Sequence, residues 1–247
     1  MIDRALIFAA GRGERMRPLS DNTPKPLLRV GGKHLIEWHL ENLVTAGVRE
    51  VVINTSHLAE QFPAALGDGS RWGLRIHYSF EGPEPLETGG GMLHALPLLG
   101  AGPFVVVNGD IWTDFDFSTL PQDPQALAHL VLADNPAHHP LGDFGIDAAG
   151  KLHPYPVAPA GRAMQALTFT GIGVYRPELL VDWRNLIGNP PGSEREPPRF
   201  STIPVLRVRM PLGQVSWQSH AGKWTDVGTA QRLAELDRRL TGAAAIE

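Results

Sequence analysis

Short apolar runs alternate with amphipathic segments along the first half of the chain. Three apolar runs predict buried strands: residues 5–9, 51–54 and 104–110, the last ending in a polar corner at Asn108-Gly109-Asp110. Apolar residues recur at helical spacing over 35–46, and a shorter helix is expected over 57–66. Residues 74–80 alternate between apolar and polar positions, as a further strand would. This order predicts an α/β fold with a doubly wound sheet, mixed and mostly parallel.

The second half of the chain is less regular. Further strands are expected over 127–133, 168–175, 205–210 and 215–218, and a final helix over 230–240 that Thr229 would cap. Two proline-rich stretches are expected to be loops: residues 134–159 and 188–198. The second of these is expected to be a mobile surface connection. No hexapeptide repeat is visible, so no left-handed β-helix domain is expected.

Composition narrows the function classes. The chain has 247 residues, of which 43% are hydrophobic, enough for the core of one large domain. Its net charge of −4 argues against general nucleic-acid binding, and the lack of cysteine excludes disulfides and thiolate metal sites. No apolar run approaches the ~20 residues of a membrane span. Acidic Asp3 before a short apolar run argues against a signal peptide, so a cytoplasmic protein is expected.

The first strand leads into glycines and then into a cluster of cations. Gly11 and Gly13 leave room for backbone N–H groups to approach an anion. Positive charge follows at Arg12, Arg15, Arg17 and Lys25. The stretch is not a dinucleotide fingerprint, because Met16 stands where the third glycine is needed, and it has no Walker A lysine. A tight turn with solvated arginines would give the same residues, but a triphosphate site explains the number of cations better.

The lysine of this region is flanked by two prolines. Pro24 and Pro26 fix the backbone on either side of Lys25, which favours an aimed side chain over a freely mobile one. Residues 9–19 and 24–27 together resemble the signature of sugar-1-phosphate nucleotidylyltransferases. Ala10 replaces the first glycine of that signature and Glu14 replaces its serine or threonine. Both changes are compatible with the family, which uses backbone amides at these positions.

Three later segments extend the resemblance over nearly the whole chain. Residues 84–89 are similar to the family segment that holds nucleobase and sugar, although Glu87 and Gly89 replace the usual glycine and alanine. Thr88 is expected to cap the helix that follows, which would run to residue 98. Asn108-Gly109-Asp110 resembles the family's metal-binding strand end. Asp226, in Trp224–Thr229, matches its second metal carboxylate, with a helix cap as the alternative.

The sugar side carries a weaker resemblance. Residues 142–145 resemble the segment that lies over the sugar, and Gly171 matches a glycine close to it. The family often carries a Glu-Lys-Pro motif further along, and this motif is missing near Lys151. His138 and His139 are expected to be exposed loop residues rather than metal ligands.

The resemblance implies a role for each matching residue. Arg15 and Lys25 would be catalytic, Arg15 at the departing pyrophosphate and Lys25 between the α-phosphate and the sugar phosphate. The implied nucleotide-binding residues are Ala9, Ala10, Gly11, Arg12, Gly13, Glu14, Arg15, Glu84, Pro85, Leu86, Thr88 and Gly89. The implied sugar-phosphate residues are Lys25, Asn108, Asp143 and Gly171. Asp110 and Asp226 would bind Mg²⁺. A single domain is implied, with a nucleotide-binding half over 1–110 and, over 111–247, a sugar-binding half with the C-terminal helix.

The implied reaction is nucleotidyl transfer from a nucleoside triphosphate to a sugar 1-phosphate, with release of pyrophosphate. The motifs Leu-Glu-Thr-Gly-Gly-Gly and Val-Asn-Gly-Asp-Ile-Trp-Thr-Asp are most similar to members that use UTP and N-acetylmuramate 1-phosphate, in cell-wall recycling. Mannose-1-phosphate guanylyl transfer and glucose-1-phosphate thymidylyl or uridylyl transfer are the alternatives. A non-catalytic nucleotide-sugar-binding regulatory subunit is the alternative of another class. A monomer or small homo-oligomer is expected, with no nucleic-acid or membrane partner.

Overall fold

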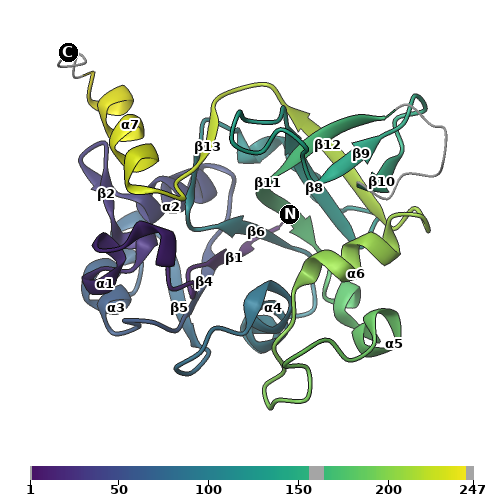
Figure 1. Ribbon diagram of the computed structural model, residues 1–247. Helices are drawn as coiled ribbons and strands as arrows, with labels where there is room; N and C mark the ends of the chain where they lie inside the picture. Colours follow the sequence, from purple (N-terminus) through teal and green to yellow (C-terminus); the bar gives the residue numbers. More distant parts are fainter. Residues whose placement is uncertain (1, 156–163, 243–247) are drawn as a thin grey trace.

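A computed structural model of the chain describes residues 2–155 and 164–242 (Figure 1). Strand β1 (Arg4–Phe8) lies inside a nine-stranded sheet between β4 (Glu50–Thr55) and β6 (Phe104–Asn108), and β5 (Arg75–Phe80) lies beyond β4. These four strands run parallel. Their carboxyl ends therefore meet at one edge, where α/β sheets bind ligands.

The other strands make the sheet mixed. The long strand β11 (Gln165–Tyr175) runs antiparallel to β6, β8 (Ala128–Ala133) and β9 (Phe144–Ile146). Beyond them lie β10 (Leu152–Pro154), antiparallel to β9, and β12 (Val215–His220), parallel to β8. This arrangement confirms the predicted mixed α/β sheet.

Helices cover both faces of the sheet. Ala5 and Ile7 of β1 belong to one core cluster with α2 (Leu35–Thr45) and α3 (Gln61–Leu66). Leu6 points the other way, into a cluster with three further helices: α4 (Glu87–Leu99), α5 (Trp183–Ile187) and α6 (Thr202–Arg209). Successive side chains of a strand point to opposite faces, so one apolar run serves both cores. The sheet is therefore doubly wound, as predicted.

A third, smaller core lies beside the first and contains Met16, Trp112, Val227 and Leu236. The last of these belongs to α7 (Ala230–Thr241), which packs against β2 (Arg29–Val30) (Figure 1). Thr229 caps this helix, as predicted: its Oγ1 accepts the N–H of Arg232. The remaining elements are α1 (Leu19–Asn22), β3 (Lys33–His34), β7 (Ile111–Thr113), β13 (Trp224–Asp226) and the 3₁₀ turns η1 (Glu14–Met16), η2 (Lys25–Leu27), η3 (Ser70–Trp72), η4 (Phe117–Thr119) and η5 (Pro177–Leu180).

Three predictions differ from the structure. The stretch at 134–159, expected to be a loop, contains the strands β9 and β10, and its residues 156–159 lie outside the described residues. Residues 205–210 are not a strand but lie mainly in helix α6, whose Val205 and Leu206 are buried. Ser201 caps this helix by accepting the N–H of Ile203, so a local capping bond outweighs the short apolar alternation. The expected helix over 57–66 begins only at Gln61.

The proline-rich segment at residues 188–198 is not a mobile surface loop along its whole length. Gly192, Ser193 and Pro198 are buried, and the carbonyl of Phe200 accepts the N–H groups of Gly89 and Gly90 at the start of α4. Buried backbone groups need such partners, and the segment therefore packs as part of the fold. Within the described residues, no helix is long and apolar enough to cross a membrane.

Candidate active site

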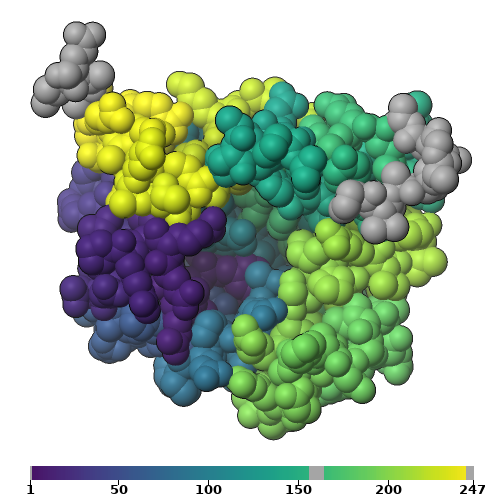
Figure 2. Space-filling model, viewed as in Figure 1, coloured from purple at the N-terminus to yellow at the C-terminus, as the bar shows by residue number. Residues whose placement is uncertain are grey.

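A cleft of about 890 Å³ opens at the carboxyl ends of the parallel strands. Figure 2 shows the molecule hollowed between its N-terminal part, in purple, and its later segments, in green. Ten of the twelve expected nucleotide-binding residues line the cleft: Ala9, Ala10, Gly11, Arg12, Gly13, Glu14, Arg15, Glu84, Pro85 and Thr88. Leu86 and Gly89 are buried behind it. The structure therefore brings two distant segments of the sequence to one cavity.

The glycine turn follows β1 directly. Gly13 has φ of +63°, a left-handed conformation that glycine adopts without strain, and it begins the 3₁₀ turn η1. A Cβ atom there would lie 3.2 Å from Ser20 and 3.4 Å from Lys25, so the turn packs closely on the lysine. Arg12 and Arg15 stay exposed at the cleft.

Lys25 packs against this turn and lines the cleft. The residue is only 7% exposed, and its Nζ donates to Oδ2 of Asp110 at 2.5 Å. A buried ammonium group is stable only with such a partner. The two prolines place the lysine in η2, and the carboxyl end of β6 places the aspartate. Lys25 and Asp110, which are 85 positions apart, therefore form one charged pair inside the cleft.

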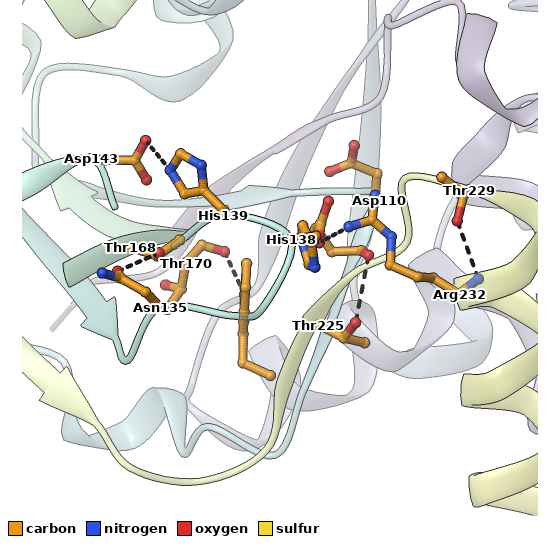
Figure 3. A network of polar contacts seen from close by, with 12 residues as sticks. Asp110, Asn135, His138, His139, Asp143, Thr168, Thr170, Thr225, Thr229 and Arg232 are labelled. Carbon is orange, nitrogen blue, oxygen red and sulfur yellow. Dashed lines mark hydrogen bonds and ion pairs between the residues drawn. The ribbon is translucent and has the colours of Figure 1, made fainter. Parts of the chain in front are cut away.

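Asp226 lies beside Asp110 because two short strands pair. β13 runs antiparallel to β7, and the N–H of Val227 donates to the carbonyl of Asp110. Oδ1 of Asp226 lies 2.7 Å from Nε2 of His138 and 2.8 Å from a guanidinium nitrogen of Arg232 (Figure 3). Since Thr229 caps α7, Asp226 is not that helix's cap.

The two carboxylates suit a hard divalent cation. Mg²⁺ takes oxygen ligands and commonly uses one or two carboxylates together with phosphate oxygens. Asp110 and Asp226 each keep one carboxylate oxygen without a hydrogen bond to the described chain. Residues 2–155 and 164–242 contain no cluster of three or more metal-ligating side chains. Phosphate oxygens of a bound substrate are ligands that would complete such a site.

A buried hydrogen-bond chain joins two walls of the cleft, the glycine turn after β1 and the segment at residues 84–88. The sequence did not predict this chain. Oδ1 of Asn54 accepts the N–H of Ala9 at 2.6 Å, and its Nδ2 donates to Oε1 of Glu81 at 2.6 Å. Oε2 of Glu81 accepts the N–H of Leu86 at 2.7 Å. Burial raises the pKa of Glu81, against the effect of these hydrogen bonds. Asn54 ends one predicted strand and Glu81 directly follows another, positions at the carboxyl edge of the sheet that could have marked them.

The wall at residues 84–88 is braced by the segment that follows α5. Glu84 pairs with Arg195, and Glu87 lies 2.8 Å from Arg199, which also lines the cleft. Arg195 lowers the pKa of Glu84 through its hydrogen bond and its charge. The predicted cap role of Thr88 is wrong: α4 begins at Glu87, and Oγ1 of Thr88 accepts the N–H of Thr202.

The expected sugar-side residues are brought together only in part. Lys25 and Asn108 line the cleft. Gly171 has φ of +81° and lies against Asn108: a Cβ atom on Gly171 would be 2.6 Å from Nδ2 of Asn108. Asp143 does not line the cleft: it accepts the N–H of Phe169 and pairs with His139 (Figure 3). His138 and His139 remain partly exposed, as expected, but both contact carboxylates.

Comparison with known proteins agrees with this geometry. The family model for nucleotidyl transferases matches residues 4–242. An N-acetylmuramate α-1-phosphate uridylyltransferase of Neisseria meningitidis is 49% identical over 97% of this chain and 99% of its own. The protein of the same name from Caulobacter vibrioides is 34% identical over 97% of both chains.

Solved structures show the same fold. A putative glucose-1-phosphate thymidylyltransferase of Bacillus anthracis, solved in complex with a sucrose, superposes with a TM-score of 0.78 at 19% identity. The match covers 99% of this chain and 97% of that one. The family model covers almost the whole chain, and the fold and the cleft described above agree with this match. The chain therefore belongs to the nucleotidyl transferase family.

Proposed function

We propose that this chain transfers a uridylyl group from UTP to N-acetylmuramate α-1-phosphate and releases pyrophosphate. The observation that carries the transfer chemistry is the convergence of the glycine turn, Lys25 and Asp110 in one cleft. The substrates are carried over from the relative that is 49% identical over 97% of this chain. A mannose-1-phosphate guanylyltransferase and a glucose-1-phosphate thymidylyltransferase are further relatives, and their reactions are the alternatives.

In the proposed reaction a phosphate oxygen of the sugar 1-phosphate attacks the α-phosphorus of UTP. The new P–O bond forms as the bond to the bridging oxygen breaks, and pyrophosphate leaves with that electron pair. Both reactants are anions, so positioning and charge stabilisation supply most of the catalysis. A sugar phosphate is already ionised near neutral pH, and the attack therefore needs no general base.

The residues divide these tasks between them. Backbone N–H groups of Gly11 and Gly13 bind triphosphate oxygens in this proposal. Arg15 neutralises the departing pyrophosphate, and Lys25 lies between the α-phosphate and the incoming sugar phosphate. Asp110 and Asp226 would hold Mg²⁺, which supplies positive charge to phosphate oxygens when bound.

The proposed organisation is a single domain with two halves. Residues 1–110 form the nucleotide-binding half and residues 111–247 the sugar-binding half with the C-terminal helix, within one domain. We propose that the protein works in the cytoplasm in cell-wall recycling, as a monomer or small homo-oligomer.

A substrate panel tests the proposal. UTP, GTP, dTTP and ATP are each combined with the 1-phosphates of N-acetylmuramate, N-acetylglucosamine, mannose and glucose, and pyrophosphate release is measured with Mg²⁺. We expect UTP with N-acetylmuramate 1-phosphate to give the highest kcat/KM. A preference for GTP with mannose 1-phosphate would contradict the uridylyl assignment and favour the guanylyl alternative. No turnover with any pair would favour the regulatory subunit.

A further inference from the structure

Glu87 occupies a strained position at the cleft. It has φ of +62°, a conformation that side-chain-bearing residues rarely adopt, at the start of α4. Its side chain is partly exposed and lines the cleft. A glycine would fit this backbone without strain, so the glutamate side chain itself needs an explanation.

The side chain of Glu87 contacts Arg199. Oε1 of Glu87 lies 2.8 Å from a guanidinium nitrogen of Arg199, and the two side chains are 40% and 38% exposed. An exposed ion pair stabilises a fold little, less than a strained backbone conformation costs. The pair therefore does not account for the strain as a stabilising contact alone.

The chain around Arg199 is built to bring it to this place. The carbonyl of Phe200 accepts the N–H groups of Gly89 and Gly90 at 2.9 and 3.0 Å. A Cβ on Gly89 would lie 2.5 Å from the ring of Phe200, and a Cβ on Gly90 would lie 2.2 Å from the carbonyl oxygen of Pro198. Both glycines thus let the segment at 198–200 approach the start of α4, and this approach places Arg199 at the cleft.

Arg199 is the cation of the cleft that comes from outside the glycine turn and the Pro-Lys-Pro segment. Arg12, like Arg199, has no assigned task in the transfer, but its guanidinium donates to the carbonyl oxygen of Pro83. Arg12, Arg15, Lys25 and Arg199 are the cationic side chains among the described lining residues. The first three come from the glycine turn and the Pro-Lys-Pro segment, where the proposed reaction places the phosphates. His138 and His139, the nearby alternatives on the sugar side, contact Asp226 and Asp143.

We propose that Arg199 binds the carboxylate of an acidic sugar 1-phosphate, and that Glu87 is a positioning residue that holds Arg199 toward the cleft. The inference rests on the proposed function and deepens it, because the lactyl ether of N-acetylmuramate carries a carboxylate that neutral sugars lack. Guanidinium groups bind carboxylates through paired, charge-assisted hydrogen bonds. A neutral sugar has no carboxylate with which this cation could form such a pair.

The test compares two sugars that differ only in the lactyl ether. kcat/KM is measured at saturating UTP with the 1-phosphates of N-acetylmuramate and N-acetylglucosamine, for the parent and for Arg199→Gln. We expect Arg199→Gln to lower kcat/KM for the acidic sugar by about 10- to 100-fold, the range for a lost charge-assisted hydrogen bond. The value for the neutral sugar should change by less than about threefold. Arg199→Lys should recover part of the loss.

Arg195→Gln is the matched control. Arg195 lies in the same segment and pairs with Glu84, but it does not line the cleft. This variant should leave the ratio between the two sugars within about twofold of the parent's. Glu87→Gly should lower the same ratio as Arg199→Gln does, while its thermal unfolding midpoint stays near or above that of the parent, because glycine relieves the strain.

An equal loss for both sugars in Arg199→Gln, or a change only in the KM for UTP, would overturn the role of Arg199. If Arg199→Gln does not fold, the ratio in Arg199→Lys decides. A parent enzyme that prefers the neutral sugar contradicts the proposed substrate itself. A parent preference for the acidic sugar that survives in Arg199→Gln contradicts only the role of Arg199.

Discussion

At the scale of single residues, Lys25 is the buried cation among the described residues that line the cleft. Its ammonium group is buried and contacts Asp110, while its stem packs against Gly13. The two prolines predict an aimed lysine, and this prediction agrees with the structure. They do not predict its contact with Asp110, because this residue lies 85 positions further along the chain.

Replacing Lys25 tests its proposed place between the two phosphates. Lys25→Met keeps the stem but removes the charge, and we expect kcat to fall by about 10²–10³-fold, as for the loss of one preorganised charge stabiliser. Steady-state rates at saturating UTP and sugar 1-phosphate measure this. Arg17→Met is the control, because Arg17 is exposed, pairs with Asp21 and does not line the cleft. A Lys25→Met enzyme with parental kcat would remove Lys25 from the mechanism.

At the scale of elements, the sequence-based predictions fail where contacts between segments far apart in the sequence determine the local conformation. Residues 205–209 lie in helix α6, where packing of Val205 and Leu206 into the core shared with α4 adds to the local cap from Ser201. The segment before it shows no periodicity, yet it is fixed by backbone bonds to Gly89 and Gly90. Neither partner is visible in the local pattern, whereas the capping threonine of α7 is.

The pairing of β13 with β7 leads to a prediction for the metal. Asp226→Asn removes one charge from the proposed Mg²⁺ site, so the Mg²⁺ concentration at half-maximal activity should rise by about tenfold or more. The same change weakens the contacts of Asp226 with His138 and Arg232, so the free energy of unfolding should fall by about 1–3 kcal/mol although Thr229 still caps α7. Mg²⁺ titrations of activity and urea unfolding check both. Thr229→Ala is the control: it should lose about 1 kcal/mol of stability and keep the parental Mg²⁺ response.

At the scale of the whole molecule, one continuous sheet carries both walls of the cleft. The apolar runs predicted the parallel strands well, because burial on both faces leaves a clear pattern. The antiparallel part of the sheet is harder to predict from sequence, because β11 pairs with three strands and its register with β8 shifts between Phe169 and Gly173. Such pairings depend on strands far apart in sequence. The sequence therefore predicts the glycine turn, Lys25 and Asp110, but not Glu81, Arg199 or the contacts of His138.

The stability of the whole molecule should depend on pH through His39. This side chain is buried in α2, its Nε2 contacts the carbonyl of Ile111, and burial lowers its pKa to about 4. The unfolded chain, with a pKa near 6.5, binds more protons between these values. The free energy of unfolding should therefore fall as pH falls from about 6.5 to 4, by up to about 3 kcal/mol.

Urea unfolding at pH 7, 6 and 5 measures this slope. His39→Gln can still donate to Ile111 and does not titrate, so its stability should vary less with pH. The pKa of His129 is also lowered by burial, and some slope of the same sign should remain. His94→Gln, at an exposed position, serves as the control and should keep the parental slope. An equal slope in His39→Gln and the parent would contradict the assignment.

The glycine run of α4 has a consequence for how related sequences can diverge. Each glycine faces a different neighbour: Gly89 the ring of Phe200, Gly90 the carbonyl of Pro198, and Gly91 the carboxylate of Glu81. A side chain at any one of them must be matched by a change elsewhere in the chain. Gly89 and Gly90 therefore mark a docked segment more than 100 positions further on. A relative that lost either of these two glycines would be expected to have replaced or redirected that segment as well, whereas loss of Gly91 would require a change at Glu81.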